Sequence, residues 1–154
     1  MFRISRRLDY GIKLMVALAQ DDENLPKSTS KIAKDLQIPL PFLHQIGHSL
    51  MQSGLIKATP GPKGGLRLNL PAEDISIHQI TESLEGPICL NNCFENGNEC
   101  EQDGNYSTQN MWSHMQEQII GYLDGVSLYD LAKPDYSNRL PVNSPFFSFV
   151  SDVK

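Results

Sequence analysis

A short basic hairpin is the feature that most limits what this chain can fold into. Residues 55–68 predict two short strands joined by a tip rich in glycine and proline. The pair Gly64-Gly65 permits backbone angles that are closed to other residues. Lys63 and Arg67 place positive charge where the hairpin projects, which suits a phosphate backbone or a minor groove. By itself the segment also fits an ordinary exposed turn, so its meaning depends on the residues before it.

Two short helical patterns with a tight connection lie immediately upstream of this hairpin. In the first, residues 28–30 offer N-cap oxygens, and the apolar residues that follow fall on one face. Pro39 ends this pattern, because a proline disfavours helical geometry in the residue before it. The second helix begins near Leu40 or Pro41, and its inward stripe is Leu43, Ile46 and Leu50. Two helices followed by a basic hairpin, the wing, predict a winged helix-turn-helix.

The outward face of the second helix carries side chains that can hydrogen-bond to base edges. For any single one of them, an ordinary polar helix face is the alternative. The outward positions are Pro41, His44, Gln45, His48, Ser49 and Gln52. The residues that we expect to contact DNA are Ser28, Thr29, Lys31, Pro41, His44, Gln45, His48, Lys63 and Arg67.

Charge is divided unevenly along the chain. The net charge of the 154 residues is −5, which is unusual for a DNA-binding protein. Residues 1–70, however, hold ten Lys and Arg against five Asp and Glu, a net of +5, and residues 71–154 hold three against thirteen, a net of −10. A basic half followed by an acidic half predicts a nucleic-acid face on one side and a different role on the other.

The N-terminal segment predicts an amphipathic helix rather than an export signal. Its apolar run, residues 14–19, is only six residues long, too short for a signal peptide or a membrane span. The stripe expected to face the core is Leu8, Ile12, Met15, Val16 and Ala19. We therefore expect a cytoplasmic protein that does not bind membranes and whose thiols are reduced unless a ligand holds them.

Downstream of the wing, the pattern Ser76–Gln79 predicts a capping box that opens a helix ending near Gly86. A loop rich in Asn, Gly, Glu and Cys follows, and from about Ser107 to Leu123 a long helix is expected. Its apolar side comprises Trp112, Met115, Ile119, Tyr122 and Leu123, with Met111 and Ile120 beside them. The same helix of a second chain is the simplest partner for such a face.

These elements divide the chain into four parts. Residues 1–86 are expected to form the DNA-binding domain, and residues 87–106 a cysteine-containing sensor loop. Residues 107–132 are expected to hold the dimerisation helix and a short closing helix, and residues 133–154 a flexible tail.

All three cysteines, Cys89, Cys93 and Cys100, lie in the loop, separated by three and then six residues. In a reduced compartment such clustering fits metal ligation better than a disulfide, and the odd number argues against full pairing. Thiolates select zinc or an iron–sulfur cluster, and a fourth ligand must then come from elsewhere. Three loop cysteines with no ligand are the alternative, because no CxxC pair is present.

With these motifs the chain resembles the winged-helix regulators typified by IscR, NsrR and CymR. The likeness covers residues 2–132, and its motifs are Leu8–Gly11, Leu50–Leu55, Gly61–Gly65, Ser107-Thr108 followed by Trp112, and Val126–Leu131. The resemblance implies a mainly helical protein with a small β-hairpin wing and a long dimerisation helix. It also implies a homodimer that binds an inverted-repeat DNA operator and regulates transcription. Many such regulators hold a 2Fe–2S or 4Fe–4S cluster on a three-cysteine loop.

The loop departs from the pattern of cluster-binding relatives. Tyr106 and Gln109 stand where those relatives place their third cysteine and a histidine ligand. Asp9 stands where the nitric-oxide sensor supplies an aspartate across the dimer, although an acid near a helix N-terminus is also favourable by itself. The ligands expected from the resemblance are Cys89, Cys93, Cys100 and Asp9 of the partner subunit.

Three functions compete on these grounds. The first is a DNA-binding regulator that senses redox state, nitric oxide or iron–sulfur status through a cluster. The second is a cluster-free regulator of the same fold that responds through thiols or a protein partner. The third is a zinc-containing enzyme or interaction module. The histidines, acids and cysteines form no recognisable catalytic spacing and the basic half would go unexplained, so no enzyme is expected.

Overall fold

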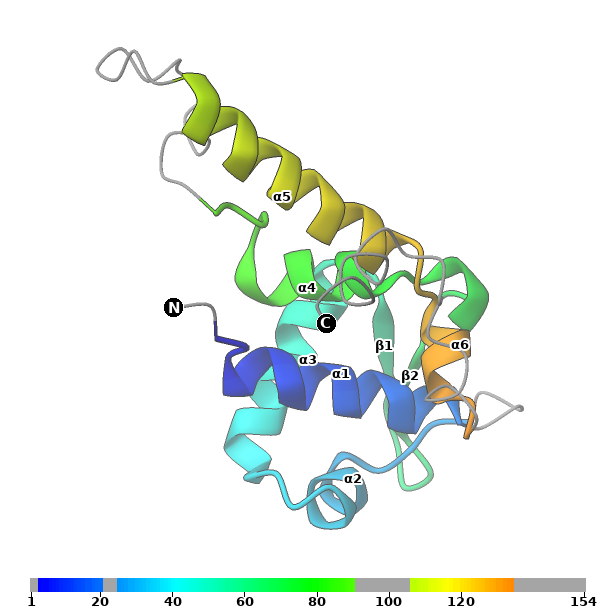
Figure 1. Cartoon of the computed structure of the whole chain (residues 1–154). Coiled ribbons are helices and arrows are strands. Elements are labelled where there is room, and N and C mark those ends of the chain that lie inside the picture. The colour runs from blue at the N-terminus through cyan, green and yellow to red at the C-terminus, as the bar shows by residue number, and fades with distance from the viewer. Residues whose placement is uncertain (1–2, 21–24, 91–105, 135–154) are drawn as a thin grey trace.

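The computed structural model describes residues 3–20, 25–90 and 106–134. Helices dominate, and a single antiparallel hairpin accompanies them in these residues (Figure 1). In chain order the elements are α1 (Arg6–Ala19), α2 (Thr29–Asp35), α3 (Leu40–Gln52), β1 (Ile56–Thr59), β2 (Gly65–Leu68), the 3₁₀ turn η1 (Ala72–Asp74), α4 (Ile77–Glu85), α5 (Tyr106–Asp124) and α6 (Leu128–Ala132). The expected fold class, mainly helical with a small hairpin wing, is confirmed.

The helix-turn-helix formed by α2 and α3 follows from its sequence. Gln37 takes a left-handed backbone, with φ of 56°, in the turn between the helices, and Pro39 is the N-cap of α3. The inward stripe of α3 is confirmed, because Leu43, Ile46 and Leu50 are all 0% exposed. The expected side-chain cap of α2 is wrong: Ser28 occupies the N-cap position, but its hydroxyl makes no capping hydrogen bond.

The stripe of α1 that was expected to face the core does so. Leu8 and Met15 are buried, and Ile12, Val16 and Ala19 are half-buried and pack against the core. The buried side is wider than this stripe, because Gly11, Leu14 and Leu18 are buried as well. Helix α1 has packed neighbours on several sides, since it contacts α3, α4 and α6 (Figure 1). At Gly11 the approach is so close that a Cβ atom would collide with the side chain of Leu84 on α4.

Local capping interactions determine where α4 begins and ends. The hydroxyl of Ser76 accepts a hydrogen bond from the backbone N–H of Gln79 at 3.2 Å. The side-chain oxygen of Gln79 accepts one from the backbone N–H of Ser76 at 2.9 Å. The helix ends at Gly86, whose φ is 82°. The capping box and the glycine stop predicted from the sequence are both confirmed.

The last helix, α6, packs back against α1 and η1. Leu128 is 0% exposed and belongs to the same hydrophobic core as α1, α3 and α4. The backbone N–H of Ile77 donates to Val126 O at 3.0 Å, and that of Leu128 donates to Ile75 O at 2.7 Å. The segment that leads into α4 and the segment that follows α5 are therefore paired like two short strands.

Helix α5 projects away from the rest of the molecule at its N-terminal end (Figure 1). Near its other end, Tyr122 and Leu123 pack against the core. Trp112, Met115 and Ile119 are half-buried, and in the part of the chain that the structure describes they lie outside that core. Within the described ranges, no helix has both the length and the apolar character needed to cross a membrane.

Candidate nucleic-acid interface

The outward face of α3 is polar, exposed and without fixed charge. His44, Gln45 and His48 are exposed on the side opposite the buried stripe. The 13 residues of α3 include no Lys, Arg, Asp or Glu. Because the buried stripe anchors the helix rigidly, this face offers amide and imidazole groups at fixed positions. Such groups can pair with the edges of bases in a major groove.

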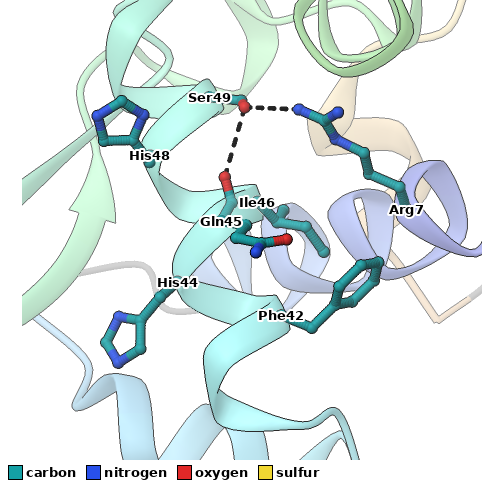
Figure 2. A pocket seen from close by; sticks show the side chains of 7 residues that line it. All are labelled: Arg7, Phe42, His44, Gln45, Ile46, His48 and Ser49. Atoms are coloured by element: carbon teal, nitrogen blue, oxygen red, sulfur yellow. Dashed lines mark hydrogen bonds between the residues drawn. The ribbon is translucent and has the colours of Figure 1, made fainter.

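A hollow of about 600 Å³ lies beside this face of α3 (Figure 2). Its lining residues are Arg7, Phe42, His44, Gln45, Ile46, His48 and Ser49. In Figure 2, His44 and His48 point to one side of α3, and Arg7 reaches the helix from the other side. The Nη2 atom of Arg7 donates a hydrogen bond to Ser49 Oγ at 2.7 Å. We call this cavity the Arg7 hollow.

Arg7 was not among the residues predicted to contact DNA. Its hydrogen bond with Ser49 joins positions 42 residues apart, so helical spacing cannot predict it. Phe42, which also lines the hollow, meets Tyr10 of α1 edge to face, with ring centroids 5.7 Å apart. This ring pair and the Arg7 hydrogen bond both fix α3 against α1.

Backbone hydrogen bonds hold the wing against the residues just before α2. Its strands β1 and β2 pair with Thr59 opposite Gly65, which leaves residues 60–64 as the tip. Leu66 exchanges two backbone hydrogen bonds with Lys27, at 2.8 and 2.9 Å. The tip carries Lys63, which is exposed as expected.

Arg67 lies on strand β2 rather than at the tip. It is half-buried and stands opposite Lys57 on β1, so two cations are neighbours across the hairpin. Its Nε atom is buried and has no hydrogen-bond partner among the described residues. The wing therefore concentrates positive charge along its strands as well as at its tip.

The predicted DNA contacts lie on consecutive elements of one domain. Thr29, like Arg67, is half-buried, and the other predicted contacts are exposed. Ser28 and Lys31 belong to the start of α2, which packs against α3. The residues that were predicted to contact DNA are thus presented together by α2, α3 and the wing.

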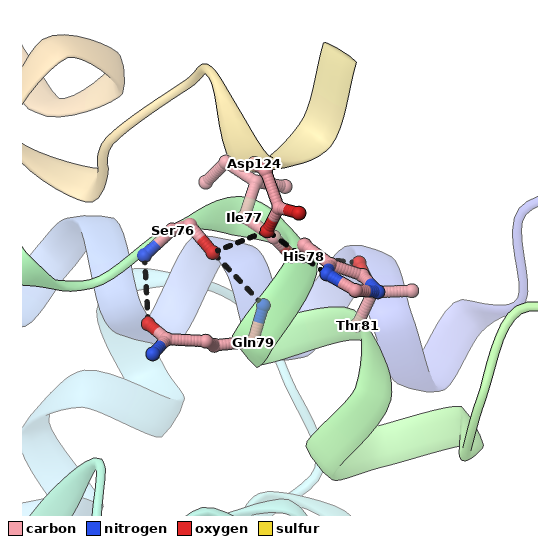
Figure 3. A network of polar contacts seen from close by, with 6 residues as sticks. All are labelled: Ser76, Ile77, His78, Gln79, Thr81 and Asp124. Carbon is pink, nitrogen blue, oxygen red and sulfur yellow. Dashed lines mark hydrogen bonds and ion pairs between the residues drawn. The ribbon is translucent and has the colours of Figure 1, made fainter. Parts of the chain in front are cut away.

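A polar joint connects α4 to the C-terminal end of α5 (Figure 3). Asp124 Oδ1 accepts a hydrogen bond from Ser76 Oγ at 3.3 Å and lies 2.9 Å from His78 Nδ1. The carboxylate stands at the N-terminus of α4, where the helix dipole favours a negative charge. This α4–α5 joint fixes the end of the projecting helix against the core.

The cysteine segment begins directly after α4. Cys89 is half-buried, and the neighbouring Leu90 N–H donates to the side-chain oxygen of Gln116 on α5 at 3.0 Å. Cys93 and Cys100 lie outside the described residues. Asp9 holds Lys13 of its own helix at 2.7 Å. Within the described ranges, no three His, Cys, Asp or Glu side chains gather as metal ligands. The donor chemistry of three thiols nevertheless fits an iron–sulfur cluster or zinc.

Known proteins resemble this chain in sequence and in fold. The sequence model of the Rrf2 family, described as an iron-dependent transcriptional regulator, matches residues 4–134. The HTH-type transcriptional regulator IscR of Cereibacter sphaeroides is 29% identical over 140 residues, covering 85% of this chain and 87% of that protein.

Solved structures agree with this match. CymR, the global cysteine regulator of B. subtilis, aligns with a TM-score of 0.74 at 28% identity, covering 86% of this chain and 97% of CymR. IscR of T. potens aligns with a TM-score of 0.70 at 26% identity, covering 90% and 92%. These relatives are named as regulators rather than enzymes. The chain therefore belongs to the Rrf2 family and is a DNA-binding transcriptional regulator with a winged-helix fold.

Proposed function

We propose that this regulator binds an inverted-repeat operator as a homodimer, with α3 in the major groove. The observation that carries the proposal is the exposed, uncharged, hydrogen-bonding face of α3, held in place by its fully buried stripe. Gln45 offers both a donor and an acceptor and suits the edge of an adenine. A twofold dimer places two such helices on one side of a duplex, with half-sites separated by about 34 Å or a multiple.

The other elements position this helix on the backbone. Ser28, Thr29 and Lys31 at the start of α2 supply hydroxyl and ammonium donors for phosphates. Lys63 and Arg67 supply the wing's interaction with the backbone or with a minor groove. In this proposal residues 1–86 bind DNA, and the closing helix α6 completes the core of that domain.

Removing charge from the wing tests one half of this proposal. Replacing Lys63 and Arg67 together by Ala is expected to weaken binding to operator and random DNA alike. Log K decreases as log salt increases, and this slope should become shallower by about 0.9 for each phosphate that the variant no longer neutralises. Gln45→Ala should instead relax preference for the operator by about 1–3 kcal/mol, the discrimination that one paired base provides. Fluorescence anisotropy over a range of salt concentrations measures both effects.

Lys13→Ala is the matched control for these variants, because Lys13 lies on α1 and is paired with Asp9 of the same helix. It should leave the salt slope unchanged. If the double variant of Lys63 and Arg67 keeps the wild-type salt slope, the wing does not contact DNA phosphates. Equal decreases in affinity for operator and random DNA in Gln45→Ala would show that this side chain does not read bases.

For the dimer, the proposal relies on α5. Its Trp112, Met115 and Ile119 are half-buried apolar side chains that lie outside the hydrophobic core formed by the described residues. A second copy of α5 offers the same apolar face, and such self-complementary surfaces form twofold dimers. Residues 107–124 are accordingly assigned to dimerisation.

We further propose that the cysteine segment, residues 87–106, receives the signal through an iron–sulfur cluster, 2Fe–2S or 4Fe–4S. The proposed ligands are Cys89, Cys93, Cys100 and Asp9 of the partner subunit. The proposal is supported by the three thiols and by the iron-dependent description of the family. When bound, the cluster supplies a linkage that redox change or nitric oxide can break. A cluster-free regulator that responds through thiols or a protein partner is the second candidate, favoured by the likeness to a cysteine regulator.

Anaerobic iron and sulfide analysis of freshly purified protein distinguishes the two candidates. We expect the native protein to contain iron and sulfide, and each of Cys89→Ala, Cys93→Ala, Cys100→Ala and Asp9→Ala to lack them, because each removes one ligand. Asp35→Ala, at an exposed acid on α2, is the control and should retain both.

The pattern among the variants is informative. Full iron content in Cys89→Ala alone would show that this cysteine is not a ligand. An iron-free native protein that still binds the operator would support the cluster-free candidate.

A further inference from the structure

The DNA-facing helix of this regulator has no permanent positive charge of its own. Its 13 residues carry no Lys or Arg, although a helix in the major groove lies between two rows of phosphates. Among the residues that line the Arg7 hollow, Arg7 is the one with a permanent charge. It comes from α1, and its hydrogen bond to Ser49 places that charge beside α3.

Ser49 stands at the edge of the outward face of α3. It follows Gln45 by one turn and is half-buried, whereas Gln45 and His48 are exposed. A charge held at Ser49 therefore lies beside the base-reading face rather than within it. Groups at the edge of a groove meet the sugar–phosphate backbone, while groups at its centre meet bases.

The guanidinium of Arg7 retains free donors after this hydrogen bond. Arginine carries five N–H donors in a planar fork, and Nη2 supplies the bond to Ser49. Arg7 is exposed, and it faces a hollow of about 600 Å³ that is open beside α3. A phosphate oxygen pair is the ligand that matches such a fork, through charge-assisted bidentate hydrogen bonds.

We infer that Arg7 binds a backbone phosphodiester of the DNA beside α3, and that Ser49 positions its guanidinium for this role. The inference rests on the proposed function, because it requires α3 to occupy the groove. Its consequence is that α1 takes part in DNA binding: Arg7 fixes the register of a recognition helix that cannot itself bind phosphate through a permanent charge.

Operator duplexes that each carry one neutral methylphosphonate test the inference directly. Wild-type protein should bind more weakly when the phosphate that meets Arg7 is neutralised. Arg7→Ala should bind unmodified DNA at least about tenfold more weakly, and its salt slope should be shallower by about 0.9. The variant should also become insensitive to neutralisation at that phosphate, while it stays sensitive at the others.

Three further variants make the test specific. Arg6→Ala removes the same charge from an exposed neighbour on α1 and should keep the sensitivity at that phosphate. Arg7→Lys keeps the charge without the fork and should lie between wild type and Arg7→Ala. Ser49→Ala should weaken binding in the wild-type background and have no further effect in Arg7→Ala, because the hydroxyl acts through Arg7. Thermal unfolding of each variant confirms that it is folded.

The outcomes separate this inference from the proposed function. If Arg7→Ala binds weakly but keeps the wild-type pattern of phosphate sensitivity, Arg7 only ties α1 to α3 and the inference is wrong. The same conclusion follows if Arg7→Ala binds normally while Gln45→Ala still relaxes operator preference. If neither variant changes binding, α3 does not enter the groove, and the proposed function fails together with the inference.

Discussion

Replacing Gly65 with alanine is expected to lower the free energy of unfolding by about 2–4 kcal/mol, because no side chain fits at this position. Gly65 has a φ of 154°, and a Cβ atom built on it would collide with the backbone carbonyl of Lys27. Lys27 exchanges two hydrogen bonds with the adjacent Leu66, so relief of the collision breaks that pairing. Urea unfolding measures the decrease in stability.

The matched control is the same glycine-to-alanine change at Gly47 of α3. A Cβ atom there would lie 3.6 Å from the side chain of Leu66, an ordinary separation, and no backbone atom obstructs it. Gly47→Ala should therefore be neutral or stabilise by up to about 1 kcal/mol, because alanine is the better helix former. Wild-type stability in Gly65→Ala would show that the pairing of Lys27 with Leu66 does not hold the wing.

The change Ile119→Asp is expected to convert the dimer to monomers and to weaken operator binding about 100-fold or more. An aspartate at this position would place an unpaired charge in the proposed α5 interface, which costs about 3–5 kcal/mol. Sedimentation equilibrium measures the dimer, and anisotropy with the full operator measures how far binding to paired half-sites is weakened.

His114→Asp introduces the same charge at an exposed position of α5 and should remain dimeric. Far-UV circular dichroism should show that both variants keep their helices, since Ile119 does not pack in the core. A dimeric Ile119→Asp protein would assign dimerisation to another surface.

Sequence patterns predicted the elements whose causes are local. The capping box at Ser76, the glycine stop at Gly86 and the buried stripe of α3 each depend on residues a few positions apart, and all three are present. Interactions between distant segments could not be predicted in this way. Arg7 meets Ser49, and Lys27 meets Leu66, only because the packed core brings separate elements together.

The extent of the buried side of α1 has the same origin. The expected stripe faces the core, but Gly11, Leu14 and Leu18 are buried as well, because α3, α4 and α6 pack around this helix. For the candidate DNA site, the sequence predicted contacts by the outward residues of α3, and these contacts stay predictions. It did not predict that Arg7, which comes from another helix, lines the hollow beside α3. Two of the three predicted thiol ligands, Cys93 and Cys100, lie outside the described residues, so their placement stays a prediction.

The pairing of residues 75–77 with 126–128 also has a consequence for the order of synthesis. Leu128 fills a place in the core that residues 1–86 leave open, and it is held there by the bond from its N–H to Ile75. A chain leaves the ribosome N-terminus first, so residues 87–124 are already made when α6 arrives to close that core. A nascent chain released before residue 128 lacks the part of the core that Leu128 fills. Every molecule with a complete winged-helix core therefore already carries its cysteine segment and the helix α5.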